Sequence, residues 1–211
     1  MDTCYCCESK STGREHVPPR CFFSRDKEPK NLITVPSCPS HNSGKSDCDE
    51  YLKFVLTASS NNIPSDVTNS TVRGMIRHIK KDSKIINKYG VTKGDAQYFF
   101  GKDFEVDVEL ICDCLDKIAK GIYYFHNKGS KKIIGFFQVS PIFLGINPDC
   151  SDEMRQRIEK ITVYTYQDMR EYPMHGENQD IFSYQVIENE EIIVLNMLFY
   201  KEKVVSTMFS K

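Results

Sequence analysis

Two pairs of potential metal ligands lie near the start of the chain. Cys4 and Cys7 have C-x-x-C spacing, and Cys38 and His41 have C-x-x-H spacing. Together they supply the four sulfur and nitrogen ligands that zinc binds in tetrahedral geometry. Such a zinc ion has no open position for water or substrate, so we expect it to be structural. Cys6 could replace a member of the first pair only with poorer spacing.

Between the two pairs, the stretch GREHVPPR places a carboxylate beside an imidazole, Glu15 and His16. An imidazole with an ordinary pKa of about 6.5 can take a proton from water near neutral pH. Adjacent residues of a strand point to opposite faces, so these two can serve one site only where the strand ends. Pro18 and Pro19 mark that end.

This ordered set resembles the zinc-containing HNH endonucleases, which are ββα-metal-finger nucleases. The resemblance covers residues 4 to about 52 and rests on four elements. They are the C-x-x-C pair, Glu-His followed by Pro, Asn-Leu about fifteen residues later, and the second pair followed by Asn. Beyond residue 60 we recognise no named domain.

The resemblance implies a role for each matching residue. His16 would be the general base, and Asn31 would brace the loop and so orient it. Glu15 and Asn42 would bind one catalytic divalent ion, Mg²⁺ or Mn²⁺. A carboxylate and an amide oxygen make an open site of the kind that Mg²⁺ occupies, with several waters retained. The implied products carry a 5′-phosphate and a 3′-hydroxyl.

Two positions depart from the family pattern. Glu15 stands where Asp is common, so the ion would be reached by a longer arm or through water. His41 stands where the second pair usually ends in Cys, and we assign it to zinc. The rival assignment makes His41 a ligand of the catalytic ion and leaves zinc with three cysteines.

Basic residues near the motif are candidates for contact with DNA phosphates. Arg14, Arg20 and Lys45 flank the motif directly. A predicted helix over residues 67–90 adds a basic face, which would either contact DNA or be only a solvated surface. That face contains Arg73, Arg77, Lys80, Lys81, Lys84 and Lys88.

The whole chain predicts an α+β fold with a zinc-stapled ββα-metal finger, a helical middle and a C-terminal antiparallel β-meander. We expect helices over residues 46–56 and 105–129, and a short helix over 151–159. Gly121 lies inside the second of these, and an internal glycine disfavours one unbroken helix. Residues 1–60 would form the finger, and 61–211 a region of unknown role that packs with the finger or stands apart. Runs rich in β-branched and aromatic residues predict strands over 131–139, 160–166, 181–187, 191–200 and 204–210.

Composition narrows the class of protein. The 211 residues are 40% hydrophobic and 27% charged, as in folded soluble proteins. The sequence has no run of eighteen apolar residues and no apolar leader at its start, which predicts neither a membrane span nor secretion. Nine cysteines, an odd number, without a leader favour metal binding in a reducing cytoplasm over a disulfide framework.

The leading hypothesis is therefore a metal-dependent endonuclease that hydrolyses DNA phosphodiester bonds. A second hypothesis is a non-catalytic zinc module that binds nucleic acid or protein. A third concerns context, because small HNH proteins resemble nuclease effectors of bacterial defence systems. There, a partner ATPase or sensor would control the nuclease, and the residues after 60 would offer the docking surface.

Overall fold

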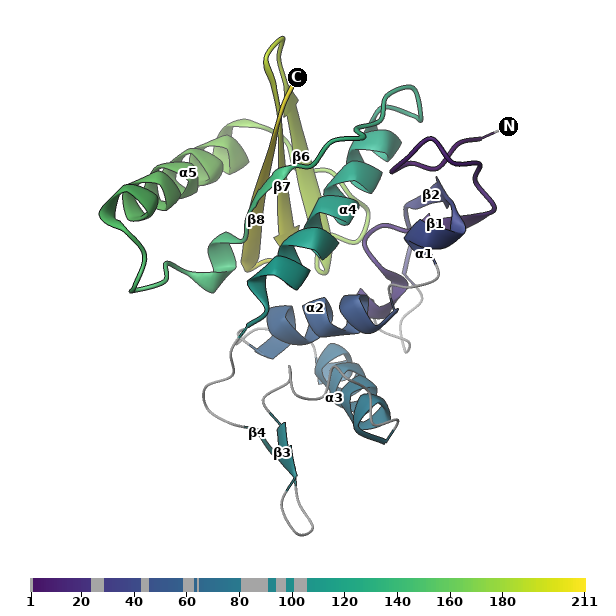
Figure 1. The fold of residues 1–211 in the computed structure, drawn as a ribbon, viewed down its shortest axis with the longest axis vertical. Coiled ribbons are helices and arrows are strands. Elements are labelled where there is room, and N and C mark those ends of the chain that lie inside the picture. Colours follow the sequence, from purple (N-terminus) through teal and green to yellow (C-terminus); the bar gives the residue numbers. More distant parts are fainter. Residues whose placement is uncertain are drawn as a thin grey trace.

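The computed structural model describes residues 2–23, 29–42, 46–58, 63, 65–80, 91–93, 98–100 and 106–211. The fold is mixed α+β with antiparallel sheets, as the sequence predicted (Figure 1). The helices are η1 (Arg20–Phe22), α1 (Pro39–Asn42), α2 (Ser46–Ala58), α3 (Ser65–Lys80), α4 (Val108–His126), η3 (Ile142–Leu144) and α5 (Asp152–Glu171). The strands are β1 (Gly13–His16), β2 (Thr34–Ser37), β3 (Val91–Lys93), β4 (Tyr98–Phe100), β5 (Gln138–Ser140), β6 (Phe182–Glu188), β7 (Ile192–Phe199) and β8 (Lys203–Ser210).

The predicted C-terminal meander is confirmed. Strands β6, β7 and β8 pair antiparallel in sequence order, and β5 pairs with β8 at the edge. In the tight turn after β7, Tyr200 and Lys201 have positive φ angles of 52° and 59°. Two successive left-handed residues match the right-handed twist of a hairpin. The turn before β7 is held by Asn189, whose Oδ1 accepts hydrogen bonds from the backbone N–H groups of Glu191 and Ile192.

The sheet has two different faces, and a helix covers each (Figure 1). Toward α4, the register aligns Tyr184, Met197 and Val205, which are all buried. The opposite face carries a buried polar ladder that runs toward α5. Its members are Gln185, Asn196 and Ser206, joined by hydrogen bonds of 3.3 Å and 2.9 Å.

Helix α4 runs unbroken where the sequence suggested an interruption at Gly121. A Cβ at Gly121 would lie 2.7 Å from Cγ2 of Val17, so glycine is needed here for the close approach of the chain that leaves β1. Asp107 caps the helix by accepting a 2.9 Å hydrogen bond from the N–H of Leu110. Ile111, Leu115, Ile118 and Ile122 follow one another at intervals of three or four residues and are all buried.

The N-terminal segment and the C-terminal sheet share one hydrophobic core. Phe22 of η1 meets Phe199 of β7 edge to face, with ring centroids 5.8 Å apart. Tyr200 donates its hydroxyl proton to the carbonyl oxygen of Phe22 at 3.2 Å. Buried side chains on both sides of residue 60 belong to this core, so the two predicted regions pack against each other.

The strand predicted over residues 160–166 is wrong, because these residues lie inside α5. The predicted short helix over 151–159 is the beginning of α5, which continues to Glu171. Ser151 caps it by accepting from the N–H of Met154 at 3.2 Å, and Asp152 and Glu153 lie in its first turn. With no Gly or Pro inside, a capped helix continues despite the β-branched run.

Two further predicted elements, one strand and one helix, are shorter in the described residues than the sequence indicated. Of the strand predicted over residues 131–139, only the end belongs to β5, because the N–H of Phe137 donates to Asp116 Oδ1 of α4 at 2.8 Å. The helix predicted over residues 67–90 is α3 up to Lys80. Its remainder, with Lys81, Lys84, Ile86, Lys88 and Gly90, lies outside the described residues.

Candidate functional site

The four predicted zinc ligands converge. The ligand atoms of Cys4, Cys7, Cys38 and His41 all lie within 4.8 Å of one another. Sγ of Cys7 is 3.8 Å from Sγ of Cys38, and 3.6 Å from Nδ1 of His41. A tetrahedral zinc ion with bonds of about 2.3 Å to sulfur and about 2.0 Å to nitrogen requires S–S and S–N separations of about 3.8 Å and about 3.5 Å. The donor set therefore fits zinc.

Short local contacts shape the cluster from the N-terminal side. The N–H of Cys4 donates to the carbonyl oxygen of Ser9 at 2.9 Å, and Thr3 pairs with Lys10 in an antiparallel bridge. The chain thereby turns so that both cysteines of the first pair face inward. Cys6 does not belong to this cluster, and its backbone N–H donates to Sγ of Cys4 at 3.5 Å.

The second pair lies at the junction of β2 and α1. The N–H of His41 donates to the carbonyl oxygen of Cys38 at 3.1 Å, which closes the first turn of the helix. Burial acts to raise the pKa of the Cys38 thiol, but hydrogen bonds with His41, Cys4 and Cys7 lower it to about 6. The thiolate is the form that binds metal, so this lowering favours ligation by Cys38, whereas burial is the main cause that raises the pKa of Cys4.

Glu15 is held by two hydroxyl groups that the sequence did not single out. Tyr5 donates to Glu15 Oε2 at 3.3 Å, and Ser37 donates to the same oxygen at 3.4 Å. Tyr5 is fully buried and meets the ring of His41 edge to face. Burial and the Glu15 charge strongly raise the pKa of Tyr5, so its hydroxyl keeps its proton and donates. The signal in the sequence was an aromatic residue inside the first cysteine pair.

His16 is the last residue of β1 and is paired with Thr34 of β2. The ladder continues one step further, because the N–H of Val17 donates to the carbonyl oxygen of Ile33 at 3.0 Å. The prolines follow, so the strand ends where the sequence indicated. Glu15 is buried and His16 only partly, as expected for neighbours on opposite faces of a strand.

Asn31 braces its loop against the C-terminal half of the molecule. It has a φ angle of 35°, and its side-chain N–H donates to Glu177 Oε2 at 2.8 Å. Beside it, Lys30 and Asn178 exchange two hydrogen bonds of 3.0 Å and 2.6 Å. This anchor joins residues that are 146 apart in sequence, so no local pattern could have predicted it.

Asn42 is exposed at the end of α1, and its Nδ2 lies 3.3 Å from where a Cβ on Gly13 would stand. It therefore lies beside the first residue of β1, whereas His16 is the last. Four residues are implied to be catalytic, and the contacts described above join Glu15 to Tyr5 and Ser37, and Asn31 to Glu177. Those four are Glu15, His16, Asn31 and Asn42.

The predicted phosphate contacts have different surroundings. Arg14 is exposed but tied across the hairpin, where its Nε and Nη2 donate to Oγ1 and O of Thr34 at 3.0 Å and 2.9 Å. Arg20 is exposed in η1 and lines a cleft. Lys45 lies outside the described residues.

Comparison with known proteins adds no identity. No family model, no curated protein and no solved structure matches the chain. Among the helices in the described ranges, none is both long enough and apolar enough to cross a bilayer. The class that fold and site define is thus an α+β protein with a candidate Cys₃His metal centre.

Proposed function

We propose that the protein is a metal-dependent endonuclease of the HNH type that hydrolyses DNA phosphodiester bonds. The observation that carries the proposal is the order of elements around the metal centre. An antiparallel β1–β2 pair leads directly into α1, and the Cys₃His cluster ties this unit to the N-terminal knuckle. That arrangement supports a zinc-stapled ββα unit, with Glu15 and His16 at the end of its first strand.

In this proposal, His16 takes a proton from the attacking water. Glu15 and Asn42 bind the divalent ion, whose charge would stabilise the phosphate and the leaving 3′ oxygen. The hydroxyl groups of Tyr5 and Ser37 support the role of Glu15, because donors on one carboxylate oxygen fix its orientation toward an ion. Zinc takes no part in the reaction and holds β2 and α1 against the knuckle.

The test is plasmid cleavage with Mg²⁺ or Mn²⁺ by the zinc-loaded protein and by His16→Ala. A matched control is His126→Ala, which removes an exposed imidazole from α4. Loss of a general base should lower the rate by about 10² to 10⁴-fold, and the control should cut like wild type. Equal rates for wild type and His16→Ala would overturn the assignment.

A second candidate function is a non-catalytic zinc module that binds nucleic acid or protein. One observation favours it: Glu15 is only 8% exposed. Zinc content and plasmid nicking, measured on one sample, separate the two functions. Stoichiometric zinc with measurable binding and no cleavage under either ion would support the module.

The third hypothesis, a defence effector controlled by a partner ATPase or sensor, changes none of these residue roles. It adds a condition to the assay, because the nuclease would cut only with its partner present. Cleavage should therefore be measured with the isolated protein and with any protein that copurifies with it.

A further inference from the structure

A cleft of about 500 Å³ opens between η1, α2 and α3. Its charged side chains are Arg20, Lys53, Arg73, Arg77 and Glu50, so four cations face one anion. A cavity of this size suits a nucleotide-sized group. An excess of arginine and lysine on one concave surface attracts phosphates.

Contacts within the cleft hold several of these groups in place. Arg77 Nη2 lies 2.7 Å from Oε1 of Glu50, and their side chains are 45% and 22% exposed. Lys53 is only 4% exposed and donates its Nζ to the hydroxyl of Ser70 in α3. Gly74 brings α3 close to α2, since a Cβ there would lie 2.9 Å from Glu50 Oε2. A pre-formed site loses little side-chain entropy on binding.

The cleft lies near the end of β1. Arg20 follows His16 by four residues, and a fully extended chain of that length spans at most about 14 Å. The duplex axis rises about 3.4 Å per nucleotide of one strand. The backbone of Arg20 therefore lies within about 14 Å of that of His16, a span of a few nucleotides along a strand.

We propose that this cleft binds the phosphodiester backbone of a nucleic acid next to the position of His16. The choice of a nucleic acid as the ligand rests on the proposed function, whereas the cleft itself is described independently of it. The guanidinium of Arg73 is exposed, and with Arg20 it would form charge-assisted hydrogen bonds to phosphate oxygens. Such contacts position a strand without reading its sequence. Lys53 is the residue that sequence reasoning missed, a cation between the buried Leu52 and Phe54 of α2.

The experiment measures binding without cleavage. His16→Ala protein is titrated with a fluorescein-labelled oligonucleotide, duplex or single-stranded, over a range of salt concentrations. Arg20→Ala/Arg73→Ala is compared with Arg170→Ala, which removes an exposed charge from α5. Losing two phosphate contacts should weaken binding about tenfold and reduce the slope of log Kd against log salt by about 2, while the control changes neither. Glu50→Gln, an isosteric removal of the anion, should tighten binding.

Several outcomes overturn the proposal. They are equal affinities and slopes for the double variant and the Arg170→Ala control, no oligonucleotide binding by any form, or displacement by free nucleotide at the same affinity as the oligonucleotide. These results are distinct from those of the cleavage assay. If His16→Ala cuts plasmid like wild type but binding depends on Arg20 and Arg73, the assignment of His16 as general base fails and the cleft stands. If neither form cuts plasmid and binding still depends on Arg20 and Arg73, the nuclease function fails and the cleft stands.

Discussion

The N-terminal segment, residues 2–23 and 29–42, and the C-terminal sheet, β6 to β8, are held by different interactions. In the first, the short strands β1 and β2 are framed by a candidate metal centre and a buried Tyr5–Glu15–Ser37 contact. In the second, three strands of seven or eight residues pair along their whole length. Apolar side chains cover one face, and a hydrogen-bonded ladder crosses the other.

This difference shows how a segment with few aliphatic residues can be ordered and still keep polar side chains at its surface. A segment that is held by metal ligands needs few aliphatic residues for a core. Polar side chains such as Arg14 and His16 can therefore lie at its surface. The sheet is held by packing, and its side chains are committed to the core. The two regions meet at Phe22 and Phe199, so they differ in what orders them but share a core.

Removing zinc should have the largest effect and should be confined mainly to the first region. Structural zinc contributes about 10–16 kcal/mol in zinc-finger peptides, which rivals the whole stability of a domain. Chelation, or Cys38→Ser, should abolish amide protection over residues 2–23 and 29–42 and should lower it less in β6 to β8, which share a core with them. Hydrogen exchange with mass spectrometry measures both, and Cys150→Ser, outside the cluster, is the control. Retained protection over residues 2–23 and 29–42 without metal would contradict a structural role.

Phe199→Ala tests the junction between the two regions. Phe199 is fully buried against Phe22 at 5.8 Å and Phe182 at 5.0 Å. The cavity should lower the free energy of unfolding by about 3–5 kcal/mol. If the core is shared, urea unfolding monitored in both regions should shift together. Separate transitions, with only the sheet destabilised, would show that the regions are energetically independent.

The sequence predicted features that short spacings encode. Two pairs of ligands, each three residues apart, sufficed for the metal centre, and strands separated by a few residues sufficed for the meander. Such patterns involve residues close together in sequence, so they can be recognised without knowing how distant segments pack.

The sequence could not predict features decided by distant contacts. Residues 160–166 have the composition of a strand, but capping at Ser151 and hydrogen bonds from Gln185 to the carbonyl oxygens of Asp168 and Tyr172 stabilise a helix. In the candidate site, the anchor of Asn31 to Glu177 comes from the opposite half of the chain. For residues 160–166, tertiary contacts outweigh the intrinsic strand propensity. For Asn31 and Glu177, no local sequence pattern indicates the contact.

Gly121→Ala should have a moderate effect that couples α4 to the segment after His16. The added Cβ would lie 2.7 Å from Val17 Cγ2, and overpacking costs about 1–3 kcal/mol. The higher helix propensity of alanine returns about 1 kcal/mol of this. Thermal unfolding should therefore show a net loss, and the double variant Val17→Ala/Gly121→Ala should show less than the sum of the single losses. Additive losses would mean that the two residues do not press on each other.

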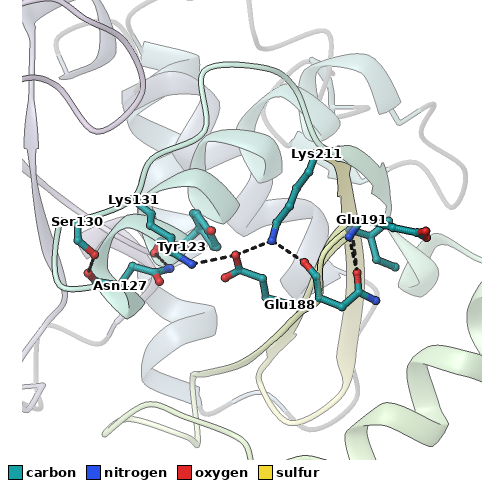
Figure 2. Close-up of polar contacts among 9 residues, drawn as sticks. Tyr123, Asn127, Ser130, Lys131, Glu188, Glu191 and Lys211 are labelled. Carbon is teal, nitrogen blue, oxygen red and sulfur yellow. Dashed lines mark hydrogen bonds and ion pairs between the residues drawn. The ribbon is translucent and has the colours of Figure 1, made fainter.

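The smallest effect concerns the charged end of the sheet. Glu188 of β6 accepts hydrogen bonds from Lys211 at 2.8 Å and Lys131 at 3.0 Å, which tie the last strand to the loop after α4 (Figure 2). The pKa of Glu188 is lowered, mainly by the hydrogen bond from Lys211. Partial desolvation acts in the opposite direction but is the smaller effect. The stabilisation that this carboxylate contributes is therefore complete above the ordinary pKa of 4.5 and is lost as pH falls through the lower folded value.

Glu188→Gln should thus lower the free energy of unfolding by less than about 1 kcal/mol at neutral pH, because the pair is partly exposed to water. The difference from wild type should shrink below pH 4.5, where the wild-type carboxylate also takes up a proton. Glu191→Gln, on the exposed turn beside it (Figure 2), should show no such pH dependence. Melting curves between neutral and acid pH measure this, and a gap that persists in acid would mean that packing, not charge, connects the sheet to this loop.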